Sequence, residues 1–212
     1  MLNINNLRQE YRLKSLNIVN LNPDPFLQFH LWFNEAKHVQ VIEPNALTLA
    51  TASAEGRPSS RMILLKGMDA KGFLFFTNYQ SRKGRDLSVN PFACMTFYWA
   101  ELERQVILDG SVEKISQNES EAYFASRPRS SQLGSWASHQ DQILESREEL
   151  EAAYKNYEQE FEGKPVPKPP YWGGYRLLPV RFEFWQGRQN RLHDRFRYLL
   201  TDGVWKIERL AP

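Results

Sequence analysis

The feature that most constrains the fold is a series of short, strand-like apolar runs between residues 46 and 116. "ALTLATAS" and "SRMILLKG" flank the polar turn "AEGRP", an arrangement typical of a β-hairpin. "GFLFFTN", "ACMTFYW", "RQVILDG" and "SVEKIS" follow, separated by polar or glycine-containing turns. This short spacing favours an antiparallel barrel or sandwich over alternating βαβ units. Three more strands are predicted from "GGYRLLPVRFEFWQG", "WQGRQNRLHDRFRY" and "VWKIERLAP".

Helices are predicted at three places around these strands. One begins after Asp24, which can act as an N-cap for a first turn that contains Pro25. A second follows the capping box "SQNE" at 116–119 and runs to about Ser126. A third covers 141–161, where apolar residues recur at helical spacing. The chain is therefore predicted to be mainly β, with peripheral helices.

One domain accounts for this pattern. Residues 21–212 contain no internal repeat and no sign of a second core, and "GKPVPKPP" is expected to be an extended connector. Residues 1–20 are polar and without clear periodicity, so a mobile N-terminal arm is expected there.

Positive charge is local in this sequence rather than global. The chain has 27 Lys+Arg against 25 Asp+Glu, a net charge of +2, whereas a nucleic-acid binder usually has a larger basic surplus. The basic residues gather in "RMILLK" (61–66), "SRKGR" (81–85), "YFASRPRSSQ" (123–132) and "WQGRQNRLHDRFRY" (185–198). GxGxxG and GxxxxGK[ST] motifs are absent, so a phosphate would be held by side chains. Four such clusters in one aromatic-rich domain predict a site for a flat, phosphate-bearing ligand.

Two of these clusters have a predicted geometry. In 123–132, Tyr123 and Arg127 share a helix face, and the hydroxyl of Ser131 follows just beyond. Such a set can cradle a phosphate, although each basic cluster taken singly could be an ordinary solvated surface. A strand over 185–198 would alternate its side chains between two faces. The basic face would hold Arg191, His193, Arg195 and Arg197, and the other face Leu192, Asp194, Phe196 and Tyr198.

The cysteine content and the lack of long apolar segments indicate in which compartment the protein works. The single cysteine, Cys94, excludes an intramolecular disulfide and a thiolate zinc cluster, and its apolar neighbours predict a buried core thiol. No apolar signal segment and no membrane-spanning run is evident. We expect a soluble cytoplasmic protein without a bound metal.

At these clusters the sequence resembles the pyridoxamine/pyridoxine 5′-phosphate oxidases, flavoenzymes of vitamin B6 metabolism. The matching segments include "TLATASAEGRPSSRMILLKG", "GFLFFTNYQSRKGRDL", "YFASRPRSSQLGSWAS", "RLHDR" and the terminal "RLAP". The resemblance implies a split β-barrel and a homodimer, with two FMN molecules at the subunit interface that are each touched by both chains. It also implies oxidation of pyridoxamine 5′-phosphate and pyridoxine 5′-phosphate by O2 to pyridoxal 5′-phosphate. Hydrogen peroxide would be released, with ammonia from the amine.

The resemblance also implies which residues of this chain contact FMN and the substrate. The FMN contacts would be Arg61, Met62, Ile63, Leu64, Leu65, Lys66, Phe76, Thr77, Arg82, Lys83, Gln105, Gln140, Asp141, Trp185 and Arg195. The substrate contacts would be Arg8, Gln9, Glu10, Tyr11, Lys66, Tyr123, Arg127, Ser131, Arg191 and His193. The catalytic pair would be Arg191, over the substrate ring, and His193. A guanidinium stays protonated and is no general base, whereas His193 could be a proton acceptor or a positioning contact.

Two positions depart from the family pattern. Asp141 stands where relatives usually have serine, and a carboxylate cannot donate a hydrogen bond to a phosphate. Ser15 stands where a glycine is expected, in the arm that would close over the site. Two other classes of protein stay open at this stage: a non-catalytic flavin or heme binder on the same barrel, and a nucleic-acid-binding module.

Overall fold

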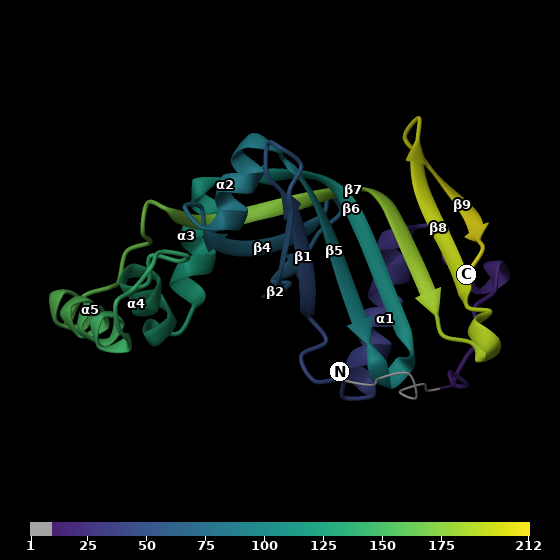
Figure 1. Cartoon of the computed structure of the whole chain (residues 1–212), viewed down its shortest axis with the longest axis horizontal. Helices are drawn as coiled ribbons and strands as arrows, with labels where there is room; N and C mark the ends of the chain where they lie inside the picture. The colour runs from purple at the N-terminus through teal and green to yellow at the C-terminus, as the bar shows by residue number, and fades with distance from the viewer. Residues whose placement is uncertain (1–9) are drawn as a thin grey trace, which may run out of the picture.

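The computed structural model describes residues 10–212, and a single curled sheet dominates it (Figure 1). Its nine strands are antiparallel in the order β2-β1-β5-β6-β7-β4-β3, with β8 added to β7 and β9 added to β8. The strands are β1 Ala46–Ala52, β2 Pro58–Leu64, β3 Gly67–Met68, β4 Phe73–Asn78, β5 Phe92–Trp99, β6 Arg104–Lys114, β7 Trp172–Gln186, β8 Asp194–Thr201 and β9 Val204–Leu210. The predicted hairpin is confirmed as the β1–β2 pair.

Within residues 10–212, five α-helices lie around the sheet. They are α1 Pro25–His38, α2 Arg82–Val89, α3 Gln117–Ser126, α4 Arg129–Ala137 and α5 Arg147–Glu160. The side chain of Asp24 accepts from the N–H of Phe26 (2.8 Å), which confirms the predicted start of α1. Phe29 of α1 is buried against Phe97, with ring centroids 5.0 Å apart, and so closes the core on one side of the sheet. The mainly β class with peripheral helices is confirmed.

Strand β7, with 15 residues, is the longest strand of the sheet and changes partner halfway along (Figure 1). Its first half pairs with β4 and its second half with β8, while β6 lies along its other edge. The register with β6 shifts at Asp109/Gly110, where β7 contains Pro179 and an extra residue, Val180. A Cβ on Gly110 would lie 1.9 Å from the carbonyl oxygen of Leu178, so only glycine fits there. A bulge of this kind bends a strand, which lets one strand serve both parts of the sheet.

The strand predicted over 185–198 is wrong in its first half. β7 ends at Gln186, a short 3-10 helix covers Gln189–Arg191, and β8 begins at Asp194. Asn190 and Arg191 have φ of 57° and 60°, in the left-handed region, and this breaks the strand. Arg191 and His193 therefore share no strand face with Arg195, and Leu192 is 68% exposed rather than inward. From Asp194 to Tyr198 the predicted alternation is confirmed.

Other boundaries also differ from the predictions. The helix predicted over 141–161 begins only at Arg147, where Ser146 is the N-cap, and the segment before it is a loop. "RQVILDG" and "SVEKIS" form one strand, β6. The basic cluster "SRKGR" forms the start of α2, with the Ser81 hydroxyl as its cap. The capping box of Ser116 and Glu119 is confirmed, and α3 ends at Ser126 as predicted.

Cys94 is only partly buried, because it lies on the face of β5 opposite the fully buried Met95 and Phe97. Burial raises the pKa of its thiol, so the thiol stays protonated at neutral pH. Within residues 10–212, no group of three or more His, Cys, Asp or Glu side chains could hold a metal ion. The same part of the chain contains no helix of the length and apolarity needed to cross a membrane.

Asp194 ties the N-terminal segment to the C-terminal strands. Its carboxylate accepts from the backbone N–H of Leu16 (3.0 Å) and from the guanidinium groups of Arg188 (2.8 Å) and Arg209 (2.9 Å). Leu16, within the predicted N-terminal arm, is itself buried in the core. Burial raises the pKa of Asp194, but the three donors outweigh it and hold that pKa below its ordinary value.

This lowered pKa predicts a pH-dependent contribution to stability. A carboxylate that is stabilised in the folded state contributes above its unfolded pKa, about 3.9, and the contribution is lost as pH falls through the lower folded pKa. Asp194→Asn should therefore reduce the free energy of unfolding by about 2 kcal/mol at neutral pH. Urea unfolding measures the free energy of unfolding of the wild type and the variant at neutral pH and below about pH 3. The difference between the two proteins should be smaller at the lower pH. An equal difference in stability at the two pH values would contradict this role of Asp194.

Candidate functional site

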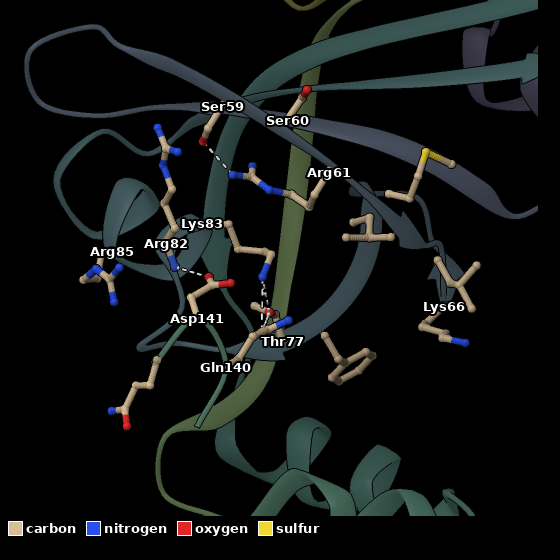
Figure 2. Close-up of a pocket in the computed structure, with 15 residues that line it drawn as sticks. Ser59, Ser60, Arg61, Lys66, Thr77, Arg82, Lys83, Arg85, Gln140 and Asp141 are labelled. Atoms are coloured by element: carbon tan, nitrogen blue, oxygen red, sulfur yellow. Dashed lines mark hydrogen bonds between the residues drawn. The ribbon is translucent and has the colours of Figure 1, made fainter. Parts of the chain in front are cut away.

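A cavity of about 740 Å³ lies between β2, β4 and the start of α2 (Figure 2). Its lining is strongly basic and comes from three separate parts of the chain. The lining residues are Ser59, Ser60, Arg61, Met62, Ile63, Leu64, Lys66, Phe76, Thr77, Arg82, Lys83, Arg85, Gln140, Asp141 and Gln142. Most residues predicted to contact FMN are thus brought together here; the exceptions are Leu65, Gln105, Trp185 and Arg195. Leu65 is buried in the core instead.

Lys83 is the most deeply buried cation of this cavity, at 4% exposure. Its ammonium donates to Thr77 Oγ1 (3.2 Å), Ser81 Oγ (3.1 Å) and Gln140 Oε1 (3.2 Å), all of them neutral. No carboxylate within residues 10–212 lies at ion-pair distance from it. Burial lowers the pKa of Lys83, and the more distant Asp141 opposes that shift. A buried ammonium with only neutral partners favours an anion in the adjoining space.

Arg61 reaches the same cavity from β2 and is held by hydroxyl groups. Its guanidinium donates to Thr51 Oγ1 (2.8 Å) and Ser59 Oγ (2.6 Å). Both hydroxyls in turn donate to Asp86 of α2, at 2.7 and 3.0 Å. Burial lowers the pKa of Arg61, with Asp86 opposing that effect. The guanidinium is therefore fixed in orientation, and no carboxylate in the described part of the chain forms a direct ion pair with it.

Asp141 occupies the N-terminus of α2. Its carboxylate accepts from the backbone N–H of Arg82 at 2.7 Å, as Figure 2 shows, and its φ is 69°. A helix N-terminus is a place that favours anions. Asp141 thus anchors the loop before α5, and it places a negative charge in an otherwise basic cavity.

A second cavity of about 360 Å³ adjoins the first and shares Phe76, Thr77 and Gln140 with it. Arg127 and Ser131 line it, and Arg127 is held by a hydrogen bond to Ser135 Oγ (2.7 Å). The remaining lining residues are Asn78, Gly134, Ser135, Ser138 and Trp172.

Aromatic stacking fixes the other side chains of the predicted phosphate cradle beside this second cavity. Tyr123 stacks on Phe76 with ring centroids 3.8 Å apart. The guanidinium of Arg127 lies over the Trp172 ring, 4.8 Å from its centroid. Tyr123, Arg127 and Ser131 are therefore assembled here, while Lys66 lines the first cavity only.

The other predicted contacts form a second group on a different part of the sheet. Gln105, Trp185 and Arg195 are directly paired across β6, β7 and β8. The rings of His193 and Tyr11 lie 4.7 and 5.5 Å from that of Trp185.

The predicted contacts Arg191 and Glu10 lie outside the lining of both cavities. Arg191 belongs to the short turn that precedes His193. Glu10 is exposed and contacts Arg12. Arg8 and Gln9 lie outside the described residues.

His193 has one ring nitrogen already engaged. Its Nδ1 accepts from the backbone N–H of Arg188 (3.1 Å), which leaves Nε2 as the protonated nitrogen of the neutral ring. Burial and the neighbouring Arg191 lower the pKa of His193. The imidazole is therefore neutral at physiological pH and better suited to orienting a partner than to acting as a cation.

Sequence reasoning missed several lining residues. Ser59 could have been found, because it lies two positions before Arg61 on a strand and so faces the same side. Arg85 was within a recognised basic cluster. Ser135 follows Ser131 by one turn of α4, a helix that was not predicted, so no signal pointed to it.

Two family models together match most of the chain. The one described as pyridoxamine 5′-phosphate oxidase matches residues 34–161. The one described as pyridoxine 5′-phosphate oxidase C-terminal dimerisation region matches residues 172–212, which include Trp185, His193 and Arg195.

Curated relatives named pyridoxine/pyridoxamine 5′-phosphate oxidase are similar over nearly the full length. The protein from Acaryochloris marina is 52% identical over 209 residues, which cover 99% of this chain and 95% of the relative. The protein from Rubrobacter xylanophilus is 54% identical over 206 residues, covering 97% and 95%.

Solved structures extend the comparison to the fold. PhzG from Burkholderia lata 383, in complex with tetrahydrophenazine-1-carboxylic acid, has a TM-score of 0.89 at 34% identity, covering 94% of this chain and 99% of that one. A pyridoxamine 5′-phosphate oxidase-related, FMN binding protein from Nostoc punctiforme has a TM-score of 0.72 at 19% identity, covering 91% and 100%. The second likeness shows the fold alone. The predicted split β-barrel is confirmed.

Proposed function

The chain belongs to the pyridoxamine 5′-phosphate oxidase family, and on that premise we propose that it oxidises pyridoxine 5′-phosphate and pyridoxamine 5′-phosphate to pyridoxal 5′-phosphate. O2 is reduced to H2O2 in each turnover, and the amine also consumes one water and releases ammonia. The observation that carries this proposal is the pair of adjoining cavities, each with its own cationic anchor, that share Phe76, Thr77 and Gln140. Two phosphate-bearing ligands that must touch each other fit such a pair.

FMN fits the larger cavity, because that cavity contains the buried and otherwise unneutralised Lys83. Arg61, Arg82 and Lys83 would hold its phosphate group. When bound, FMN supplies a two-electron acceptor that can pass electrons on to O2.

The substrate phosphate fits the smaller cavity. Tyr123, Arg127 and Ser131 would hold the phosphate ester, with Lys66 at the edge of the neighbouring cavity. This group lies remote from the reacting carbon, and its binding energy orients that carbon. Arg191 would lie over the substrate ring, where its fixed positive charge favours departure of a proton from the alcohol or amine. His193 would position the substrate through its neutral ring.

A homodimer is proposed because one protomer does not bring all these residues together. Gln105, Trp185 and Arg195 continue the row of Tyr98 across the sheet, on the face of β5 opposite its buried residues. Met62 and Phe92 are exposed on that face, at 65% and 62%. Apolar side chains exposed together mark an interaction surface. In the proposed dimer, this face of one protomer completes the cavities of its partner.

An anaerobic absorbance spectrum, taken before and after addition of pyridoxine 5′-phosphate, tests the function directly. A flavin band that bleaches and returns on admission of air supports the oxidase. A flavin band that does not change would favour a non-catalytic flavin binder, and a heme band a heme binder. A protein that takes up no FMN, or that binds DNA or RNA with strong salt dependence, would contradict the proposal.

Asp141 gives a prediction specific to this chain. Asp141→Asn removes a negative charge near the proposed phosphate site but keeps an oxygen that can accept from the Arg82 N–H. FMN should bind about three- to tenfold more tightly, because a repulsive charge is lost. Quenching of flavin fluorescence on titration of the apoprotein measures this. Asp141→Glu keeps the charge and is the control, and equal affinities for all three proteins would contradict the prediction.

A further inference from the structure

Helix α3, which bears part of the proposed phosphate cradle, is attached to alternate residues of β7. The contacts along the strand are Arg176 with Glu119, the Gly174 N–H with Ser120 Oγ (3.2 Å), and the Trp172 ring with those of Tyr123 and Phe124. The side chains of Arg176 and Trp172, four residues apart, lie on one face of β7, and the backbone N–H of Gly174 between them makes the third contact. A Cβ on Gly174 would lie 2.4 Å from Ile115 Cδ1, so glycine at this position permits the close approach of Ile115, the residue before the N-cap of α3.

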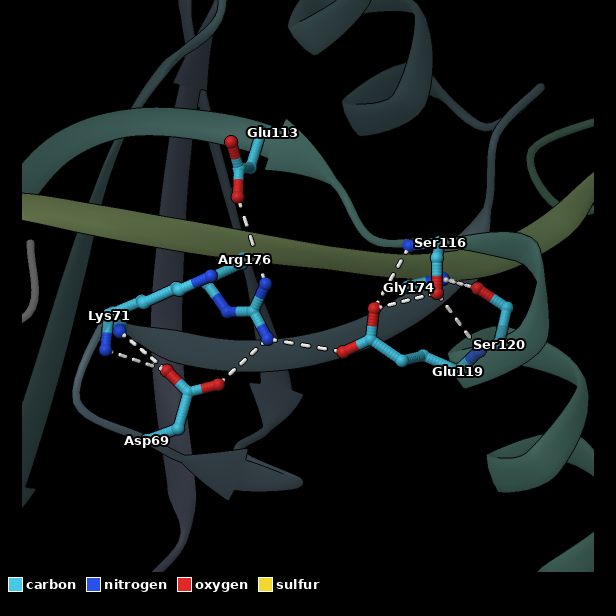
Figure 3. A network of polar contacts seen from close by, with 9 residues as sticks. Asp69, Lys71, Glu113, Ser116, Glu119, Ser120, Gly174 and Arg176 are labelled. Atoms are coloured by element: carbon cyan, nitrogen blue, oxygen red, sulfur yellow. Dashed lines mark hydrogen bonds and ion pairs between the residues drawn. The ribbon is translucent and has the colours of Figure 1, made fainter.

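Arg176 is the charged end of this attachment (Figure 3). Its side chain is 10% exposed and contacts three carboxylates from three segments. The distances are 2.7 Å to Asp69 of the β3–β4 turn, 3.7 Å to Glu113 of β6 and 3.2 Å to Glu119 of α3. Of these three carboxylates, only that of Glu119 belongs to the helix, so this is the contact through which Arg176 can affect the position of α3.

The two carboxylate oxygens of Glu119 have different partners. One oxygen accepts from the backbone N–H of Ser116 (3.1 Å) and from its hydroxyl (2.7 Å), which completes the capping box. The other oxygen pairs with Arg176. The side chain of Glu119 thus both caps the first turn of α3 and attaches it to β7.

The spacing of residues along α3 places the ion pair of Glu119 with Arg176 on the same helix face as the phosphate cradle. Glu119, Tyr123 and Arg127 follow one another at intervals of four, so they lie on one face of the helix. Tyr123 is stacked on Phe76, and Arg127, at the C-terminal end of the helix, lines the smaller cavity. A shift of the first turn along β7 would therefore displace both cradle side chains.

We propose that Arg176 is a positioning residue for the substrate: through Glu119 it sets where α3 lies on β7, and so where Tyr123 and Arg127 meet the phosphate. This inference rests on the proposed function, because the ligand of the cradle is there taken to be the substrate phosphate. Arg176 itself does not line either cavity.

Glu119→Gln in the FMN-loaded enzyme is the most selective test. Glutamine at this position can still complete a capping box, so only the ion pair with Arg176 is lost. The KM for pyridoxine 5′-phosphate should rise about three- to tenfold, with kcat changed by less than about twofold. The dissociation constant of FMN should stay the same. Backbone amides of residues 117–127 should exchange hydrogen for deuterium faster.

Asp69→Asn is the matched control. It removes a carboxylate from the same guanidinium, but that carboxylate belongs to the β3–β4 turn and not to α3. The KM and the exchange of residues 117–127 should stay at their wild-type values. Arg176→Met should also raise the KM, and Arg176→Lys should raise it less, because an ammonium can still pair with Glu119.

Three results would overturn the inference: an unchanged KM in Glu119→Gln, an equal rise in Asp69→Asn, or unchanged exchange in residues 117–127 of Glu119→Gln. A wild-type protein that does not oxidise pyridoxine 5′-phosphate would instead refute the proposed function. Hydrogen exchange in the same variants would still decide whether Arg176 positions α3.

Discussion

Arg191→Ala is expected to keep FMN bound and to lower kcat by about 100-fold or more, the size of effect seen when one electrostatic contact to a transition state is removed. Arg191 is held at φ 60°, an unfavourable conformation for a residue with a side chain. Such strain is tolerated chiefly where it serves a site. Its charge is permanent, so it can stabilise developing negative charge without taking a proton.

Stopped-flow reduction of the enzyme by pyridoxine 5′-phosphate under nitrogen measures this effect without interference from O2. Arg197→Ala is the matched control, because Arg197 comes from the same basic stretch but is paired with Glu208 on β9. That variant should react at the wild-type rate. Wild-type turnover in Arg191→Ala would exclude the proposed role of Arg191.

Lys83→Met is expected to weaken FMN binding by about 100-fold, because a charge-assisted contact to a phosphate is lost from a buried site. Methionine has nearly the length of lysine and suits an enclosed position. The apoprotein should therefore stay folded, since the variant removes a buried ammonium that had only neutral partners.

Titration of the apoprotein with FMN, together with thermal unfolding in the absence of FMN, separates binding from folding. Lys71→Met provides the control, because Lys71 is an exposed lysine on the β3–β4 turn, outside the lining of both cavities. It should bind FMN like the wild type. Undiminished affinity in Lys83→Met would show that the buried ammonium does not hold the cofactor.

Local signals in the sequence predicted much of the fold. The β1–β2 hairpin and strands β4 and β5 follow from apolar runs and turns, as does β6 apart from its continuity, and α1 and α3 follow from Asp24 and the Ser116 capping box. Helix α4 escaped prediction because Pro128 argues against a helix and no side chain caps its first turn. The turn at Asn190 and Arg191 escaped because two left-handed residues leave no mark on a period-two pattern.

The site was predictable only in part from local patterns. The basic clusters indicated phosphate groups, yet nothing in their spacing indicates that Arg61, Lys83 and Gln140 share one cavity. That proximity depends on the pairing of strands distant in sequence, which the family resemblance supplied. The split of the predicted contacts into two groups emerges only from the register of β6, β7 and β8.

The bulge in β7 has a consequence for communication within the proposed dimer. The first half of the strand supports α3 and the cradle of its own protomer, whereas the second half carries Trp185 toward the partner's cavity. The 15 residues of β7 are held by hydrogen bonds to β4, β6 and β8, so the bent strand remains one continuous element. In the proposed dimer, each β7 would therefore extend from the α3 of its own protomer to the cavity of the partner. A displacement of α3 in one protomer would then act, through β7, on the position of Trp185 beside the other cavity.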